Sequence, residues 1–456
     1  MTRSQIIGLI LGPALALFIF IFPSDLGISA RMALALTAFT VIFWTFEPIP
    51  ISYTAIFILT LFPLLEILSF ETTFQGFSGK AVWLVFAGMA LSLGITETPL
   101  GARMAQSVLG RLSGYRQLVF GLHILGLIMA LLIPSGVVRI LILMPMVVSL
   151  LKTLGESPGS KVSAGLVLSL TCATYYSGTG ILTAGVPNLV ILGVLESRNI
   201  TIYWSEWAYY LFPIIGLLRV SLLYGLIRLL FRPSREPDLS GYSAIADVPA
   251  HLTGPEKKVL GILIAGVLLW TTDVIHGIHP VYIGLGLVLF CYLPGWGPLS
   301  FDTIKKVNFP LLIFISAVFA IGHALEQSGL NLALASVFIH HLQTVETPIA
   351  QLAIIAYLAV PFDFLMDTAA VGGVLAPFLL DLGPQLGLSP LPIALSLAIG
   401  TGVVFIPYQG APFIVAYSFR YARMGQFALV MSLISLVTLI ALLPLTLLYW
   451  RMIGFI

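Results

Sequence analysis

The sequence predicts an all-α polytopic membrane protein built from inverted repeats, with about eleven transmembrane helices plus two re-entrant hairpins. Hydrophobic residues make up 59% of the 456 positions and charged residues only 9%, a composition that excludes a soluble protein. The long apolar runs are expected to be helices, because a spanning segment must satisfy its own backbone hydrogen bonds in lipid. The alternation typical of a membrane barrel is absent from the sequence.

Two stretches of the chain pass through the same series of breaks and provide the evidence for the repeats. Offsets of 230, 232, 232 and 225 residues separate the matched pairs Leu100 and Leu330, Ser135 and Asp367, Pro145 and Pro377, and Pro187 and Pro412. Repeated halves whose hydrophobic segments are broken at corresponding places are typical of secondary transporters. In such proteins the substrate site lies between the two breaks.

The elements of the first half follow from the places where apolar runs begin, end or are interrupted. Residues 1–80 hold three spans that we expect to form a scaffold, near 6–22, 31–46 and 51–68. Residues 81–231 form the first repeat, with spans at 82–95, 163–195 and 207–231 and an interfacial helix at 101–114. The run 118–151 is too long for one span and is broken at Pro134-Ser135-Gly136, which predicts a re-entrant hairpin.

The second half repeats this plan after the most polar stretch of the chain, 232–258, which we interpret as a cytoplasmic linker. Residues 259–456 form the second repeat, with spans at 259–273, 280–293, 310–325 and 427–450. A second hairpin is predicted at 347–382, with its break at Met366-Asp367-Thr368, and the span 392–417 is interrupted.

The distribution of basic residues supports this topology with the N-terminus in the cytoplasm. Of the 21 Lys and Arg residues, only Arg31, Lys80, Arg198 and Arg451 fall on the outer side, while Arg139 and Arg219 fall inside apolar segments. The remaining fifteen fall on the cytoplasmic side. The two hairpins then open from opposite sides, and the protein is expected in the plasma or inner membrane.

The breaks resemble those of the divalent-anion/sodium symporters, a family that carries dicarboxylates, citrate and sulfate. The family has a Ser-Asn-Thr signature at each hairpin tip, ten residues before a proline, and a Gly-Thr-Pro-Pro-Asn-like break in each span that follows. Here Ser135 precedes Pro145 by ten residues, and the stretch from Thr183 to Leu189 reads Thr-Ala-Gly-Val-Pro-Asn-Leu. The signatures have diverged to Ser-Gly-Val and Asp-Thr-Ala, and both asparagines are missing. The resemblance implies a homodimer, an elevator motion and sodium ions held by the tips and interrupted spans.

Two sets of candidate site residues follow. Those expected to bind substrate are Ser135, Gly136, Val137, Arg139, Asn188, Asp367, Thr368, Ala369 and Pro412. Those expected to couple ions are Ser135, Gly178, Thr179, Gly180, Asp363, Asp367, Thr401 and Gly410. Apart from sodium ions or protons, no cofactor or metal is expected.

Arg139 is the residue with the most specific prediction, because a charge at mid-membrane is costly and is kept for a function. It could bind an anion through two parallel hydrogen bonds, replace a sodium ion, or lock the hairpin through an ion pair with Asp367. Asp367 could alternatively be the N-cap of the returning arm. The glycines of the breaks could serve close helix packing instead of ion binding. The sequence does not assign a role to Arg219.

These observations predict a secondary active transporter of a small anion, a dicarboxylate or an inorganic oxyanion such as sulfate, coupled to sodium or protons. The alternatives are an anion channel or an exchanger without ion coupling. A membrane enzyme is disfavoured because the Gly-x-Ser-x-Gly and His-Glu-x-x-His motifs are both absent. The partners expected are the anionic substrate, membrane lipid and a second copy of the chain, and no nucleic acid.

Overall fold

The computed structural model describes residues 3–22, 26–109, 112, 114–234, 236–237, 251–330, 345 and 347–456. Within these ranges the chain is almost entirely helical and contains no strand, which confirms the predicted all-α class. Part of the predicted linker, residues 235 and 238–250, lies outside the described residues.

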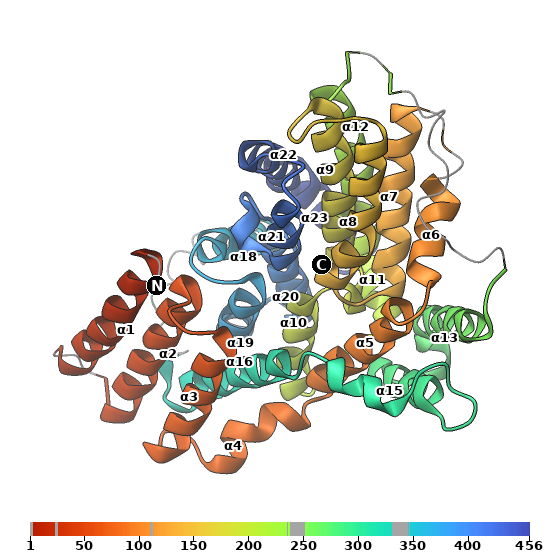
Figure 1. The fold of residues 1–456 in the computed structure, drawn as a ribbon. Coiled ribbons are helices and arrows are strands. Elements are labelled where there is room, and N and C mark those ends of the chain that lie inside the picture. The colour runs from red at the N-terminus through yellow and green to blue at the C-terminus, as the bar shows by residue number, and fades with distance from the viewer. Residues whose placement is uncertain are drawn as a thin grey trace.

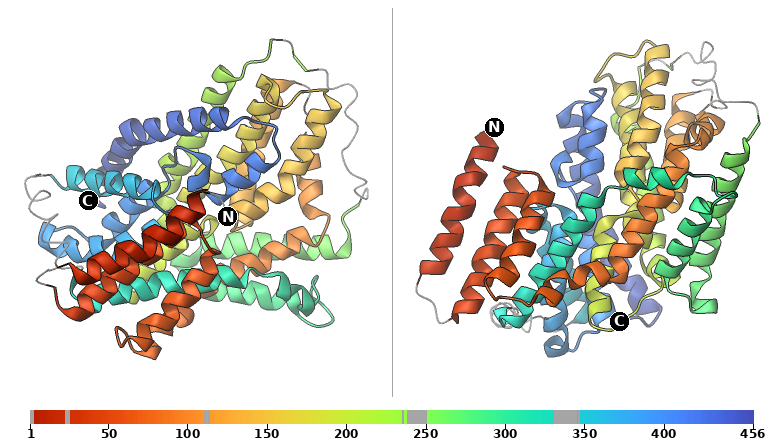
Figure 2. Two further views of the ribbon diagram at one scale, coloured as in Figure 1. Left: turned by 60° about the vertical axis from the view of Figure 1, so that its left-hand side comes forward. Right: turned by 60° about the horizontal axis from the view of Figure 1, so that its bottom comes forward.

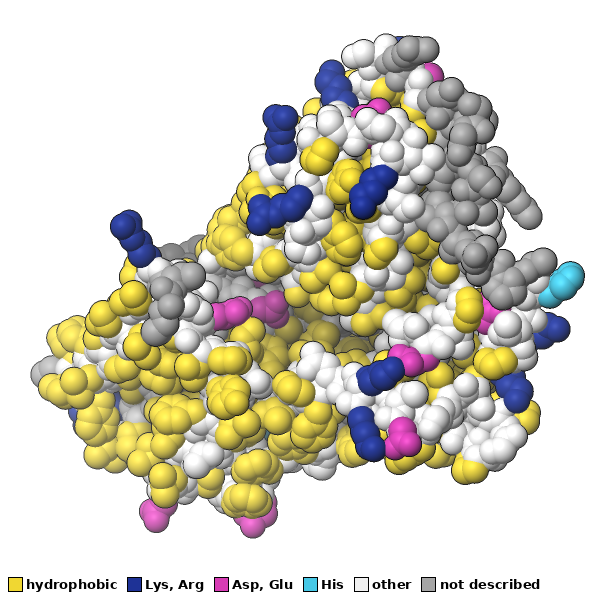
Figure 3. All heavy atoms as spheres, in the orientation of Figure 1, with side chains coloured by type: hydrophobic (Ala, Val, Ile, Leu, Met, Phe, Trp, Pro, Cys, Tyr) yellow, Lys and Arg dark blue, Asp and Glu magenta, His cyan; other side chains and the backbone are white. Residues whose placement is uncertain are grey.

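The N-terminal helices form one edge of the molecule. They are α1 (Arg3–Ile21), α2 (Ile28–Phe46), α3 (Ile51–Leu64) and α4 (Phe70–Phe74), followed by a 3-10 turn (Gln75–Ser78) and α5 (Lys80–Thr96). α1 packs mainly against α2 and lies at the outer edge, while α3 packs against α16 (Phe309–Gln327) (Figures 1 and 2). Hydrophobic side chains cover this part of the surface (Figure 3), among them Ile10, 65% exposed, and Ile21, 66% exposed. Such a face is suited to contact with lipid.

The rest of the first half contains a hairpin and a broken helix. Its elements are α6 (Leu100–Leu109), α7 (Tyr115–Leu132), α8 (Gly136–Thr153), α9 (Lys161–Tyr176), two 3-10 turns (Ser177–Gly180 and Leu182–Ala184), α10 (Val186–Ser197), α11 (Trp204–Leu211), the π-helical segment η4 (Phe212–Leu218) and α12 (Arg219–Leu230). The break between α9 and α10 contains Ser177-Gly178-Thr179-Gly180, as the sequence predicts.

The second half has the same order of elements. It contains α13 (Gly254–Thr271), α14 (Asp273–His276), α15 (Pro280–Tyr292), a 3-10 turn (Phe301–Lys306), α16, α18 (Pro348–Asp363), α19 (Thr368–Leu386), α20 (Pro390–Thr401), a 3-10 turn (Pro407–Gln409), α21 (Ala411–Ser418), α22 (Met424–Val437), the π-helical segment η7 (Thr438–Leu442) and α23 (Leu443–Met452). Thus α7 to α12 correspond to α18 to α23. The sequence did not predict that the last span of each half carries a π-helical segment.

Eight helices in the described ranges are long and apolar enough to cross a membrane, or nine if the bent pair Phe70–Ser78 and Lys80–Thr96 is one span. Three of the eight, α7, α8 and α19, are arms of the predicted hairpins. Several predicted spans are instead short apolar helices or helices joined across a break, as in α20 and α21. The chain is therefore a multi-pass membrane protein.

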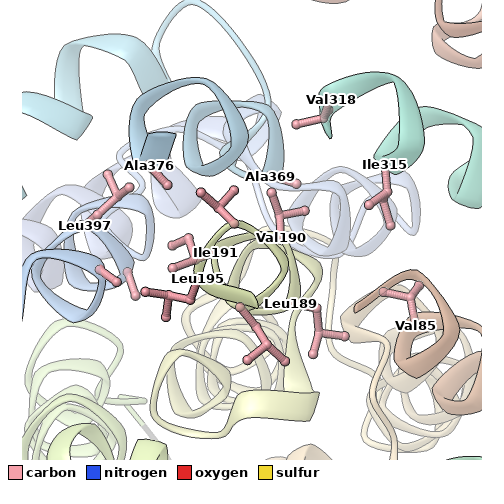
Figure 4. Close-up of a cluster of buried hydrophobic side chains, with 14 of the residues drawn as sticks. Val85, Leu189, Val190, Ile191, Leu195, Ile315, Val318, Ala369, Ala376 and Leu397 are labelled. Atoms are coloured by element: carbon pink, nitrogen blue, oxygen red, sulfur yellow. The ribbon is translucent and has the colours of Figure 1, made fainter. Parts of the chain in front are cut away.

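The two halves interlock around α10. Figure 4 shows Val190 and Ile191 of this helix facing side chains of the second half, which come from α16, α19 and α20, while Leu189 points to the other side of the helix. Residue 373 on α19 is glycine because a Cβ there would lie 1.8 Å from Val318 and 3.2 Å from Val190. This packing brings the break of the first half next to the hairpin of the second.

Candidate functional site

A cavity of 380 Å³ lies where the two hairpin tips and the two breaks meet. Four helices begin at its wall, and their N-cap residues all line it: Ser135 for α8, Gly185 for α10, Asp367 for α19 and Gly410 for α21. A helix N-terminus presents unpaired backbone N–H groups and the positive end of the helix dipole. The cavity is therefore suited to a small anion.

Close contacts at glycines fix the first hairpin tip. A Cβ at Gly88, in the middle of α5, would lie 2.6 Å from Pro134, so the tip packs directly on the backbone of a spanning helix. A Cβ at Gly136 would lie 2.7 Å from the ring of Pro412, which begins the helix after the second break. The first tip thus reaches the second break.

The two breaks also touch each other. A Cβ at Gly402, the C-cap of α20, would lie 2.6 Å from the Thr179 hydroxyl oxygen in the first break. The Tyr176 hydroxyl donates to the Val404 carbonyl across the same boundary at 3.1 Å. Tyr408, in the second break, donates to the Phe364 carbonyl at the second tip at 3.1 Å. One connected network therefore holds both tips and both breaks around the cavity.

Arg139 lies on the first turn of α8 and lines the cavity, although only 1% of its side chain is exposed. Its guanidinium donates to the Thr174 carbonyl at 2.7 Å and to the Ala184 carbonyl, while Nε has no partner. Among the described residues no carboxylate lies within ion-pair distance of Arg139. The predicted ion pair with Asp367 is therefore wrong, and the positive charge at the cavity wall is not neutralised by an acidic side chain.

Asp367 has the geometry of an N-cap, the alternative that the sequence left open. Its side chain accepts from the Ala369 N–H at 2.9 Å and begins α19. Asp363, one turn earlier at the end of α18, is fully buried, and neither of its carboxylate oxygens has a hydrogen-bond partner. A buried carboxylate without partners must be neutralised by a proton or a cation.

Nearly all of the candidate substrate-binding and ion-coupling residues predicted from the sequence line the cavity. Those that line it are Ser135, Gly136, Val137, Arg139, Gly178, Thr179, Asn188, Asp367, Thr368, Ala369, Thr401, Gly410 and Pro412. Asp363 and Gly180 do not line it. Gly180 instead permits close packing on η4, since its Cβ would lie 2.8 Å from the Phe212 Cα. Asn188 donates to the Gly178 and Ile181 carbonyls, both at 2.9 Å, and so stabilises its own break.

Sequence reasoning missed several residues of the wall. Tyr175 lies directly before the first break, a position that could have been noticed as an aromatic pair preceding Ser177-Gly178. Thr96, Lys306 and Asn308 also line the cavity, although no motif marks them. Lys306 forms an ion pair with Glu97 at 2.7 Å. Among the described residues no group of three or more His, Cys, Asp or Glu is placed to hold a metal ion.

The family model for the sodium:sulfate symporter transmembrane region matches residues 3–456. The chain belongs to this family. The chain is also similar to the L-tartrate/succinate antiporter of Escherichia coli K12, with 24% identity over 398 residues that cover 82% of this chain and 79% of that protein. A membrane protein of Cupriavidus necator is 22% identical over 343 residues, which cover 70% of this chain and 66% of its own length.

This sodium:sulfate symporter family member also has a structural relative. The YdaH transporter of Alcanivorax borkumensis has a TM-score of 0.56 and 17% identity, and the match covers 99% of this chain and 97% of that one. At this identity the likeness shows the fold alone. Together with the family, these findings identify a membrane transporter and not an enzyme.

Proposed function

We propose that this chain is a secondary active transporter of small anions that binds its substrate in the central cavity. The observation that carries this proposal is the convergence of four helix N-termini on one cavity, beside the buried Arg139 guanidinium, with which no carboxylate in the described part of the chain forms an ion pair. N–H groups from four helices and the free donors of Arg139 together favour an anion with oxygen atoms on more than one side.

The substrate class is a small dicarboxylate or an inorganic oxyanion such as sulfate. The cavity volume of 380 Å³ is at the small end of ligand sites in proteins, which suits molecules of this size. The relatives named L-tartrate/succinate antiporters favour a four-carbon dicarboxylate and exchange of one anion for another. The hairpin tips, Ser135-Gly136-Val137 and Asp367-Thr368-Ala369, are proposed to contact the substrate together with Arg139, Asn188 and Pro412.

Asp363 is the proposed coupling residue. Its carboxylate is buried without a partner, so a proton or a sodium ion bound there would relieve the cost of the charge. It ends α18 four residues before Asp367, the N-cap of α19 at the second tip, so substrate binding at the tip is proposed to change its surroundings. Coupling through Asp363 would make uptake respond to a pH gradient or a sodium gradient.

Alternating access is proposed to follow an elevator motion in a homodimer. Residues 1–80 would form the scaffold, and the two repeats at 81–231 and 259–456, with hairpins at 118–151 and 347–382, would carry the site. In the predicted orientation, with the N-terminus in the cytoplasm, Thr96 and Lys306 lie near the cytoplasmic ends of their helices. The cavity that they line would then be open toward the cytoplasm.

An anion channel and an exchanger without ion coupling are the competing functions, and one experiment separates them. The purified chain is reconstituted in liposomes loaded with unlabelled succinate, and uptake of labelled succinate, L-tartrate or sulfate is measured. A carrier shows faster uptake when the same anion is present inside, whereas a channel does not. Imposed pH or sodium gradients then distinguish coupled transport from exchange alone. Absence of uptake for all these anions would overturn the proposed function.

A further inference from the structure

Arg219 is a second buried cation, and it bridges the two breaks. Its side chain is fully buried, and its guanidinium donates to the Tyr176 carbonyl at 2.6 Å, the Thr179 hydroxyl at 2.8 Å and the Gly402 carbonyl at 3.2 Å. The guanidinium carbon also lies 4.9 Å from the centre of the Tyr176 ring. Tyr176 ends α9 and Gly402 is the C-cap of α20, so one side chain joins the carboxyl ends of the two interrupted helices.

A π-helical segment and two glycines bring Arg219 to this position. The π-helical segment η4 ends at Leu218, and Arg219 is the next residue. A π turn contains one residue more than an α turn and therefore rotates the following side chains about the helix axis. Gly180 and Gly216 allow this segment to touch the first break, because a Cβ at Gly180 would lie 3.1 Å from the Gly216 Cα. The contact is therefore built into the backbone.

The surroundings of Arg219 are those of a cation site. Carboxyl ends of half-helices and unwound carbonyls carry partial negative charge and coordinate the coupling cation in many secondary transporters. Among the described residues no carboxylate lies within ion-pair distance of Arg219. The backbone and hydroxyl oxygens of the breaks, with the Tyr176 ring, are therefore what stabilises this buried charge.

The first break has few oxygen atoms left for a free ion. Side chains donate to six carbonyls in this break and at the end of α9: Arg139 to Thr174 and Ala184, Arg219 to Tyr176, Asn188 to Gly178 and Ile181, and Trp207 to Thr179. A sodium ion at this place would have to share these carbonyl oxygens with the side-chain donors.

We propose that Arg219 is a tethered cation that takes the place of a coupling sodium ion between the two breaks, so that transport runs without sodium. This inference rests on the proposed function, because it concerns the ion requirement of the same anion site. It assigns Arg219 as a positioning residue, which holds the breaks together and supplies their positive charge permanently. Coupling of anion transport to an ion gradient would then use a proton bound at Asp363.

The test compares sodium with choline in the full-length chain. Succinate exchange is measured in liposomes containing wild type, Arg219→Ala and Arg219→Lys, with either sodium chloride or choline chloride on both sides. Wild type and Arg219→Lys, which keeps the charge, are expected to exchange at the same rate in both salts. Arg219→Ala is expected to be at least about tenfold slower in choline than in sodium, a difference of about 1.4 kcal/mol.

A sodium titration of thermal unfolding gives a second reading that does not depend on transport. Sodium should not raise the unfolding midpoint of wild type above the choline control, and should raise that of Arg219→Ala. A wild-type chain that exchanges or is stabilised only in sodium overturns the inference, even if the alanine variant does not fold. If Arg219→Ala lowers the rate of succinate exchange equally in both salts, the inference is also overturned, because Arg219 would then be purely structural. If wild type exchanges succinate in neither salt, the proposed function has failed, and the titration still decides the inference.

Discussion

Replacing Arg139 by glutamine tests the anion site most directly. Two of the five guanidinium N–H donors are used on the Thr174 and Ala184 carbonyls, and Nε has no protein partner. A charge-assisted hydrogen bond contributes about 1.5 to 3 kcal/mol, so loss of one bond to the substrate should weaken binding by about 10- to 150-fold. Arg139→Lys should be nearly as weak, because a point charge does not reproduce the planar fork.

The assay is concentration-dependent succinate uptake in liposomes, with protein quality checked by thermal unfolding and size-exclusion chromatography. Arg116→Gln is the matched control, since Arg116 is exposed at the start of α7 and the substitution removes the same charge away from the cavity. The control should retain the wild-type half-saturation concentration. Wild-type uptake by a well-folded Arg139→Gln variant would refute the assignment of Arg139 to the anion site.

Three further substitutions test the rest of the site. Asp363→Asn should abolish uptake driven by a pH gradient while leaving exchange at equal pH intact, because an amide cannot accept the proton; retained pH-driven uptake would contradict its coupling role. Gly136→Ala would place a Cβ 2.7 Å from the Pro412 ring and should slow exchange by at least about tenfold, whereas Gly225→Ala, with open space around it, should be neutral. Asn188→Ala leaves two buried carbonyls of the first break without their donor and should cost about 1 to 3 kcal/mol of stability, measured by denaturant unfolding; an unchanged midpoint would show that the amide is not structural.

The fold was largely predictable because the ends and breaks of its helices are formed by residue types with strong local effects on the backbone. Pro134-Ser135-Gly136 ends one helix and caps the next, and the glycines after Tyr176 unwind the first interrupted span. The matched offsets correctly indicated that Ser135 and Asp367 line one cavity, although they are 232 residues apart in the chain.

The side-chain partners could not be predicted in the same way. Opposite charges at the two hairpin tips suggested an ion pair between Arg139 and Asp367, but each side chain hydrogen-bonds to the backbone instead, because a broken helix exposes carbonyls and N–H groups at the same depth. Arg219 contacts carbonyls 43 and 183 residues away, and its direction depends on the π-helical segment before it. Sequence periodicity assumes a regular α-helix and therefore does not predict that the side chains after a π-helical segment are rotated about the helix axis.

The two π-helical segments also carry information about the history of the chain. They begin at Phe212 and Thr438, 226 residues apart, an offset within the range of the other matched positions. Independent insertion of an extra residue at the same step of two helices would be a coincidence, whereas one insertion in an ancestral half-length gene, later duplicated, accounts for both. By this offset the counterpart of Arg219 is Leu445, which carries no charge. The buried arginine is therefore present in only one of the two repeats, so the repeats share the π-helical segment but differ in charge at the residue that follows it.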